Sequence, residues 1–452
     1  MSRTARKDQI EHHLLRISKW LDHGNLKRVT SNLNSLHPAE ISLILEALQP
    51  CDREIAWKLI DTKLRGEVLV ELNDEVRNGL IDATPTRDLV DAAETLETDD
   101  LADIADDLPS IALEQLLHSM NNQDRQRLES VLLFDDDTAG GLMNTDTLTI
   151  RQDVTLDAVL RYLRLRGEIP DLTDSLMVVN RKDLLLGVLP LATLLTHSEE
   201  QKVSSLMLTD VESIPATLPS SEVALLFEQH DLISAPVIDN QGKLLGRITI
   251  DDVVDVIRDE ADHSIMSMAG LDEEQDMFAP VTLSAKRRAV WLGVNLLTAV
   301  AASLVIGLFE PTLEKMVALA ILMPIVASMG GVAGTQTLTL VIRGLALRQI
   351  GRSNARLLIF KELTVGVLNG IIWALVVATI AALWFNNTNL GILIGAAIII
   401  TLICAALAGA IIPLVLHQLE IDPALAGGVL LTTVTDVVGF LAFLGLATVF
   451  LA

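Results

Sequence analysis

The chain contains little cysteine and few aromatic residues. Two cysteines, Cys51 and Cys404, occur among 452 residues, and aromatic residues make up 3%. Two thiols so far apart argue against a disulfide framework and against a thiolate metal site, and they fit a reducing cytosol. The sequence also lacks a GxxxxGK[ST] phosphate loop, an HExxH pair and a Gly-x-Ser-x-Gly turn. An ATP-driven pump is therefore not expected, and we assign no catalytic residue.

Positive charge is also scarce, and it is unevenly distributed. The chain has 34 lysines and arginines against 59 aspartates and glutamates, a net charge of -25. The part after Ala285 holds nine basic and six acidic residues, a balance of +3, which leaves -28 on the first 285 residues. Such an excess repels nucleic acid and favours small divalent cations, which bind several oxygens. Solubility of a large cytoplasmic domain is an equally good explanation at this point.

The first part of the chain has a helical pattern. Its opening, MSRTARKDQIEHHLLRI, is polar and lacks a signal pattern, so we expect it to stay in the cytoplasm. Between residues 7 and 133, apolar residues recur every three or four positions, with breaks such as HPAE and TPTRDL. This pattern predicts an all-α superstructure of short stacked helices over residues 1–137.

Residues 140–262 contain a duplicated α/β layout. LMVVNRKDLLLGVLPLATLL and APVIDNQGKLLGRITIDDVV both read as strand, polar turn, strand and helix. This duplication resembles a tandem pair of CBS modules, which implies modules at 138–202 and 203–262 and a linking or plug helix region at 263–285. Thr249 and Asp252 in GRITIDDV resemble the CBS pattern for a ribose-phosphate, which implies ATP as a modulator and not as fuel.

Residues 286–452 read as a membrane domain. Five apolar segments are long enough to cross a bilayer, at 290–309, 317–342, 363–385, 390–416 and 425–451. Basic residues precede the first segment and fill the second connection, which carries four arginines and one lysine. The rule that cytoplasmic loops are basic predicts an inner-membrane protein with its amino terminus inside and its carboxyl terminus outside. Five spans are few for a permeation path, so we expect a homodimer surrounded by membrane lipid.

Asp436 is a carboxylate in the middle of the last apolar segment. An acid at this depth costs on the order of 3 kcal/mol, so it usually faces water or a partner. Thr432 lies one turn before it and Gly439 about one turn after it, a narrow polar and small-residue stripe. Two copies of Asp436 across a dimer axis suit a hydrated dication such as magnesium. A hydrogen-bonded packing role for Asp436 is the alternative.

The second apolar segment contains PIVASMGGVAGTQTL, which is rich in glycine. Pro324 and the glycines Gly330, Gly331 and Gly334 are expected to loosen the helix and expose carbonyl groups to a cavity. Close packing of helices is the alternative role for these small residues. The sequence does not choose between the two roles.

These pieces together resemble the MgtE family of magnesium channels. GEVLVEL, DDLAD, DDTAGGLM, the CBS pair, DPALAGG and TTVTDVVGF occur in the family's order over essentially the whole chain. The resemblance implies a homodimer with a central pore, passive magnesium uptake, and closure when cytosolic magnesium rises. It implies these pore-lining residues: Thr432, Thr435, Gly439, Gly330, Gly331 and Gly334.

The resemblance also implies two sets of metal-binding carboxylates. In the pore, Asp436 matches the family's carboxylate and Asp422 its acid near the cytoplasmic mouth. The sensor acids that match are Glu67, Asp99, Asp103, Asp231, Asp252, Asp255 and Glu260.

One position departs from the family's pattern. Val332 stands where the family usually has asparagine in its Gly-Gly-Asn-x-Gly motif. Two alternatives therefore remain: a membrane-anchored ion or ligand sensor that does not conduct, and a transporter of another dication such as Co2+ or Mn2+.

Overall fold

The computed structural model describes residues 3–167, 169–170, 172–272, 274–351 and 353–451, and its chain divides into two compact units. The amino-terminal unit comprises residues 1–262 and 274–279. The membrane unit comprises residues 263–273 and 280–452. The segment 274–279 therefore belongs to the amino-terminal unit although it follows the first residues of the membrane unit.

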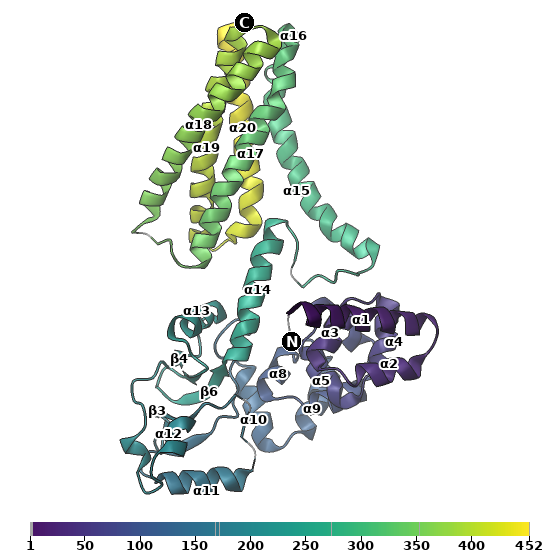
Figure 1. The fold of residues 1–452 in the computed structure, drawn as a ribbon, viewed down its shortest axis with the longest axis vertical. Coiled ribbons are helices and arrows are strands. Elements are labelled where there is room, and N and C mark those ends of the chain that lie inside the picture. Colours follow the sequence, from purple (N-terminus) through teal and green to yellow (C-terminus); the bar gives the residue numbers. More distant parts are fainter. Residues whose placement is uncertain (1–2, 168, 171, 273, 352, 452) are drawn as a thin grey trace. The chain divides into compact units, whose positions relative to one another are not determined.

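Short helices make up the first part of the amino-terminal unit, as the periodicity predicts (Figure 1). Proline or a hydrogen-bonding side chain often marks where they begin: Pro38 and Pro50 open two of them, and Asp61 and Asn73 cap two more. Their apolar faces share one core that includes Ile41, Leu45 and Trp57. The helices are α1(Arg3–Asp22), α2(Leu26–Leu33), α3(Pro38–Glu46), α4(Pro50–Lys58), α5(Thr62–Val70), α6(Asp74–Asp82), α7(Thr86–Ala93), α8(Thr98–Asp103), α9(Ser110–Ser119) and α10(Asn122–Val131).

Two three-stranded sheets of equal topology follow, which confirms the CBS pair. In each sheet the first two strands are parallel and the last two are antiparallel, with a register shift near the end of the central strand. The first module contains β1(Thr149–Arg151), α11(Leu156–Arg166), β2(Ser175–Val179), β3(Leu185–Pro190) and α12(Leu191–Thr196). A 3-10 turn, η1(Val203–Ser205), leads to β4(Ile214–Pro215), α13(Ser220–His230), β5(Ser234–Ile238) and β6(Leu244–Thr249).

The linking helix begins earlier than the sequence pattern suggests. α14(Ile250–Met268) starts directly after β6, and the segment from 269 to 280 is not helical among its described residues. The first membrane helix then begins at Val281, ahead of the basic residues 286–288. Lysine and arginine are good helix formers, so the helix extends beyond the apolar run that marked it in the sequence.

Five helices of the described chain are long and apolar enough to cross a membrane, which confirms the expected membrane domain. In the membrane unit α19 is central: 61% of its span is buried, and it packs against α17, α18 and α20 (Figure 1). Only 6% of the α15 span is buried. These elements are α15(Val281–Gly307), the short α16(Glu310–Lys315), α17(Val317–Ala346), α18(Ala355–Phe385), α19(Thr388–Gln418) and α20(Pro423–Leu451).

Candidate ion pathway and sensor residues

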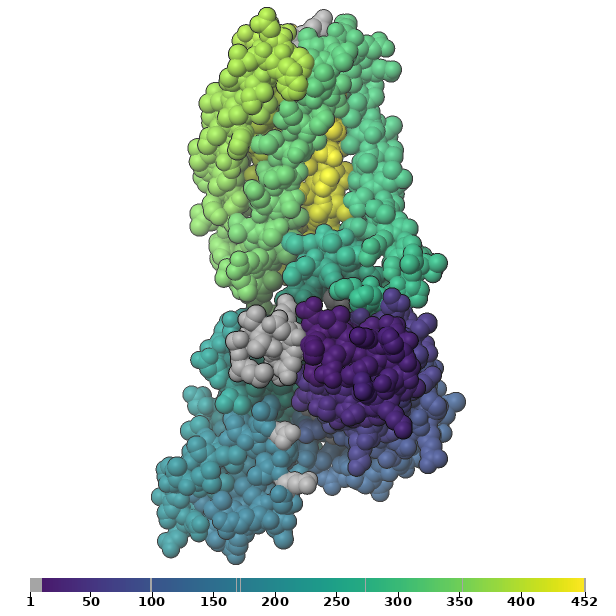
Figure 2. Space-filling model, turned by 45° about the vertical axis from the view of Figure 1, so that its right-hand side comes forward, coloured from purple at the N-terminus to yellow at the C-terminus, as the bar shows by residue number. Residues whose placement is uncertain are grey.

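Asp436 lies on a face of α20 that the rest of the membrane unit leaves partly open. Its side chain is half-buried, and the described residues offer it neither a hydrogen bond nor an ion pair. Thr432, one turn earlier, is exposed and donates its hydroxyl to the Gly428 carbonyl at 2.9 Å. Figure 2 shows α20, in yellow, reaching the surface of the membrane unit between green helices. A carboxylate at this depth without a polar partner is available to a cation.

Thr435 and Gly439 point to the inside of the bundle instead. Thr435 is fully buried and its hydroxyl bonds the Thr432 carbonyl at 3.1 Å. A Cβ on Gly439 would lie 3.4 Å from Val326 and 3.5 Å from Thr401, in ordinary van der Waals contact, so this buried position faces α17 and α19. The residues predicted to line a pore on α20 therefore occupy two faces. Thr432 and Asp436 share the open face.

The helix α17 is continuous from Val317 to Ala346 despite Pro324, so the expected loosening at the glycines is not observed. A Cβ on Gly330 would lie 2.7 Å from the Thr401 methyl group, and one on Gly334 would lie 2.8 Å from Leu431. Both glycines therefore serve close packing, because a larger residue would push these helices apart. Gly331 has nothing within 4 Å of its Cβ position, so it alone of the three borders open space.

Val332 is next to that open position and is 58% exposed. Ser328, Thr335 and Thr339 are exposed on the same α17 face, at the three- and four-residue spacing of one helix side. Between Ser328 and Thr339 this side of the helix is therefore polar except at Val332. The hydrocarbon side chain interrupts a stripe of hydroxyl groups.

Asp422 has a structural role that the sequence did not reveal. Its carboxylate accepts hydrogen bonds from the backbone N–H groups of Ala424, at 2.8 Å, and Leu425, at 3.0 Å, which caps the start of α20. Its Oδ2 also lies 3.5 Å from Nε2 of His263 on α14, within the same unit. The capping bonds hold this carboxylate at the end of the helix that carries Asp436.

A second acid inside the membrane unit has partners. Glu362 on α18 is 5% exposed, accepts a hydrogen bond from the Thr337 hydroxyl at 3.2 Å, and lies 3.1 Å from the Lys361 ammonium. Its charge is therefore compensated, and we assign it no part in ion passage. The sequence analysis had not distinguished this residue from ordinary loop charges.

The predicted sensor acids do not form one cluster within the chain. Among the described residues no group of three or more histidine, cysteine, aspartate or glutamate side chains is placed to hold a metal ion. The side chain of Asp99 lies outside the described residues. Asp252 is half-buried, and the remaining sensor acids are exposed: Glu67, Asp103, Asp231, Asp255 and Glu260.

Glu71 is an acidic neighbour of this group that the sequence analysis missed. It follows α5 in the GEVLVEL motif, one turn beyond Glu67. Burial raises the pKa of Glu71 above its ordinary value, and the nearby charge of Asp255 raises it further. The pKa of Asp255 is also raised, by partial removal from water and by the charges of Asp259 and Asp251, while Arg258 at 3.4 Å opposes the shift. Glu71 of the helical domain and Asp255 of α14 thus influence each other, and the positive charge of Arg258 lowers the pKa of both.

The residues expected to contact a ribose are engaged with each other. The backbone N–H and the hydroxyl of Thr249 lie 3.4 and 3.2 Å from the Asp252 carboxylate, and the hydroxyl also donates to Asp251. Thr249 is buried and Asp252 is half-buried, and their contact lies at the start of α14. Contact of these two residues with a ribose stays a prediction.

The architecture as a whole defines a class: a multi-pass membrane protein whose helical domain and CBS pair precede a five-helix membrane domain. Comparison with known proteins agrees. The family described as "Divalent cation transporter" matches residues 323–446, "MgtE intracellular N domain" matches residues 36–137, and "CBS domain" matches residues 203–259.

Similar proteins identify the family to which this chain belongs. The magnesium transporter MgtE of Bacillus subtilis (strain 168) is 31% identical over 97% of this chain and 97% of its own length. The magnesium transporter MgtE of Thermus thermophilus is 30% identical over 95% of this chain and 97% of its own. A crystal structure of the cytosolic domain of the Mg2+ channel MgtE with ATP covers 54% of this chain and 99% of its own, with 28% identity and a TM-score of 0.49. The chain belongs to the MgtE family of magnesium transporters.

Proposed function

We propose that this protein is a homodimeric channel that lets magnesium enter the cell passively. The observation that carries the proposal is the position of Asp436, half-buried at mid-span without a polar partner among the described residues. Magnesium keeps several of its waters when it binds protein, so one carboxylate from each protomer with hydroxyl groups nearby suffices to attract it. Thr432 supplies such a hydroxyl on the same face.

The second copy would complete the pathway. The open faces of α17 and α20 carry polar side chains within an apolar unit, and α15 is mostly uncovered. Polar groups inside a membrane are stable when they line water or meet a partner. A dimer satisfies both conditions, because two copies of Asp436 would then share one hydrated ion.

We propose further that cytosolic magnesium closes the channel. After burial, the charge of Asp255 is the next cause of the raised pKa of Glu71, so ionised Asp255 disfavours the ionised form of Glu71. An ion that binds only the arrangement in which such acids are close stabilises that arrangement by mass action. The exposed acids predicted as sensors would complete the site in the dimer.

Flux through purified protein tests both proposals. Proteoliposomes with a magnesium-sensitive dye inside and a magnesium gradient across the membrane should show influx without ATP. Added magnesium on the side of the acidic unit should stop the influx. Replacing Glu71 and Asp255 by glutamine and asparagine should leave the channel open at magnesium concentrations that close the wild type. Normal closure of this variant would exclude the two residues from the sensor.

The exposed Val332 favours one alternative, a sensor that does not conduct. Hydrocarbon on an otherwise hydroxyl-lined face weakens the hydration of a passing ion. Growth of a strain deficient in magnesium uptake separates the two functions, because only a conducting protein restores growth at low magnesium. Val332→Asn should increase flux if the side chain limits conduction.

Ion selectivity and nucleotide binding need separate measurements. One carboxylate per protomer does not discriminate among dications, so competition by Co2+ and Mn2+ in the same flux assay would define the cargo.

ATP as a modulator predicts that ATP lowers the magnesium concentration needed for closure. Thr249 and Asp252, which contact each other at the start of α14, are the residues to replace in that measurement. Accessibility of engineered terminal tags would test the proposed inside amino terminus and outside carboxyl terminus.

A further inference from the structure

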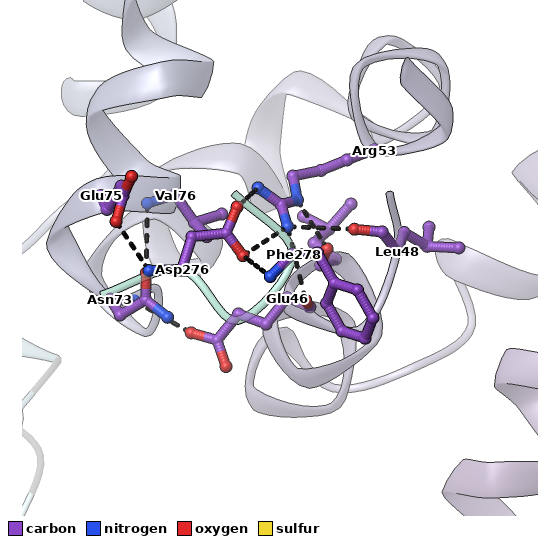
Figure 3. A network of polar contacts seen from close by, with 9 residues as sticks. Glu46, Leu48, Arg53, Asn73, Glu75, Val76, Asp276 and Phe278 are labelled. Atoms are coloured by element: carbon purple, nitrogen blue, oxygen red, sulfur yellow. Dashed lines mark hydrogen bonds and ion pairs between the residues drawn. The ribbon is translucent and has the colours of Figure 1, made fainter. Parts of the chain in front are cut away.

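A six-residue segment, residues 274–279, is attached to the helical domain by side chains far away in the sequence (Figure 3). We call it the strap. It lies directly before Pro280, the N-cap residue of the first membrane helix α15. The strap therefore directly precedes the membrane unit in the chain, while it packs as part of the amino-terminal unit.

A buried ion pair holds the centre of the strap. Both oxygens of the Asp276 carboxylate accept from the Arg53 guanidinium, at 2.7 and 3.0 Å. Arg53 is 5% exposed and Asp276 is 6% exposed. A two-pronged contact of this kind fixes position and orientation, because the planar guanidinium matches the carboxylate in only a few geometries.

The same arginine also closes the end of helix α3. Its Nε donates to the Leu45 carbonyl at 2.8 Å, and Nη2 donates to the Leu48 carbonyl at 3.0 Å. These are carbonyl groups at and just beyond the carboxyl-terminal end of α3, where regular helix hydrogen bonds end. Arg53 is thus built into the helical domain whether or not the strap is bound, so the domain presents a prepared site.

Helix α6 supplies two more contacts at its amino-terminal end. The carboxylate of Glu274 accepts from the backbone N–H of Asp74 at 2.7 Å, and that of Glu75 accepts from the backbone N–H of Asp276 at 2.8 Å. An acid at a helix amino terminus is favourable because it meets unpaired N–H groups and the positive end of the helix dipole. The strap and α6 therefore exchange one hydrogen bond in each direction, and neither depends on Arg53.

Stability by itself is a weak explanation for this arrangement. Removing two charges from water is costly, and a buried ion pair often contributes little net stability compared with apolar residues of similar size. Its better-attested effect is to select one geometry. Here the selected geometry joins the helical domain to the residues that precede α15.

We propose that the strap is a second mechanical connection between the helical domain and the membrane helices, separate from α14. Through Arg53, Asp74 and Glu75, movement of the helical domain acts directly on the start of α15. The attachment stands on the contacts above, whereas its use in closure by magnesium rests on the proposed function.

Hydrogen exchange of the full-length protein in nanodiscs tests the attachment. The amide groups of Asp276 and Phe278 should be protected in the wild type, because they donate to Glu75 and to Asp276 itself, each at 2.8 Å. Asp276→Ala should speed their exchange about tenfold or more, since local opening sets the rate. Met277→Ala is the matched control, because Met277 lies in the same strap and is 88% exposed. Free exchange of both amides in the wild type would overturn the attachment.

Flux measured on the same variants tests the coupling. We expect Asp276→Ala to raise the magnesium concentration that halves influx by about threefold or more, and Met277→Ala to leave it unchanged. Asp276→Asn keeps the shape and an acceptor oxygen, and serves if the alanine variant does not fold. If the strap amides exchange faster in Asp276→Ala but magnesium closes this variant as it closes the wild type, the proposed coupling of the strap to closure is wrong.

The two proposals fail in distinguishable ways. If the wild type passes no magnesium, the proposed function fails, and the exchange of the strap amides with and without magnesium then decides the coupling. Magnesium should slow that exchange in the wild type. Strap amides indifferent to magnesium would overturn the coupling.

Discussion

One acid in the amino-terminal unit and one in the membrane unit differ in whether a polar side chain compensates their charge. Asp276 in the strap is held by Arg53 through two hydrogen bonds, whereas Asp436 on α20 has no polar partner among the described residues. An acid that is buried for structure needs a compensating charge, because the cost of removing it from water is otherwise not offset. An acid left without compensation at membrane depth points to a mobile ion as its partner.

Glu362 shows that burial within the membrane unit does not explain why Asp436 lacks a polar partner. It is more buried than Asp436, yet it has Thr337 and Lys361 as partners. The same unit therefore contains a compensated and an uncompensated acid. This pair offers a matched test of structure against transport.

The largest expected effect is on Asp436. Asp436→Asn preserves the shape of the side chain and removes its charge, so magnesium flux should fall by about 100-fold or more while the dimer and its thermal stability are kept. Flux in proteoliposomes and thermal unfolding followed by size-exclusion chromatography would measure the two properties. Flux of the Asp436→Asn variant within twofold of the wild type would mean that Asp436 and Glu362 do not differ in their role in transport.

Glu362 should give the opposite result. Glu362→Ala leaves Thr337 and Lys361 without their shared partner and should cost about 3 kcal/mol of stability, with flux per folded protein retained. Lys361→Ala is the comparison: it leaves the buried Glu362 carboxylate without its compensating charge, so it should also destabilise the fold, with flux per folded protein retained. Loss of flux without loss of stability in Glu362→Ala would instead place this acid in the ion pathway.

The glycines of α17 sharpen the comparison between buried and open faces. A Cβ at Gly330 would lie 2.7 Å from the Thr401 methyl group, so Gly330→Ala should cost about 1–3 kcal/mol. Gly331→Ala meets nothing within 4 Å and should leave stability unchanged. Thermal unfolding of the two variants in one detergent provides the measurement. Equal stability would argue against the packing role of Gly330.

The smallest effect concerns Glu46 beside the strap. Burial raises its pKa, although the Asn73 amide, Arg258 and Arg53 oppose the shift. A raised pKa in the folded state means that the contribution to stability is complete below the unfolded value, about 4.3, and is lost as pH rises through the folded value. Glu46→Gln should therefore raise the melting temperature at pH 7 by about 1–3 °C, and the gain should vanish near pH 4. A gain that is independent of pH would contradict this cause.

Some of the residues that we propose to be functional were visible in the sequence and others were not. Asp436 stands out because a charge in a long apolar run is a local signal. Arg53 and Asp276 are 223 residues apart, so no periodicity or motif connects them. Glu71 was missed for a related reason: one of two acids in GEVLVEL matched the family pattern, and only folding brought the other near Asp255.

The sequence by itself determined the order of the domains, the duplicated CBS layout, the apolar spans and the acid at mid-membrane. Each of these depends on composition or on a short-range period, which the chain carries whatever its tertiary contacts are. Only the tertiary structure decided which of Thr432, Thr435 and Gly439 lie on the open face of α20, because residues three and four apart share a helix side until neighbouring helices cover part of it. It also decided that Gly330 and Gly334 serve packing and that the strap belongs to the helical domain, since both facts depend on atoms that are distant in sequence and close in space.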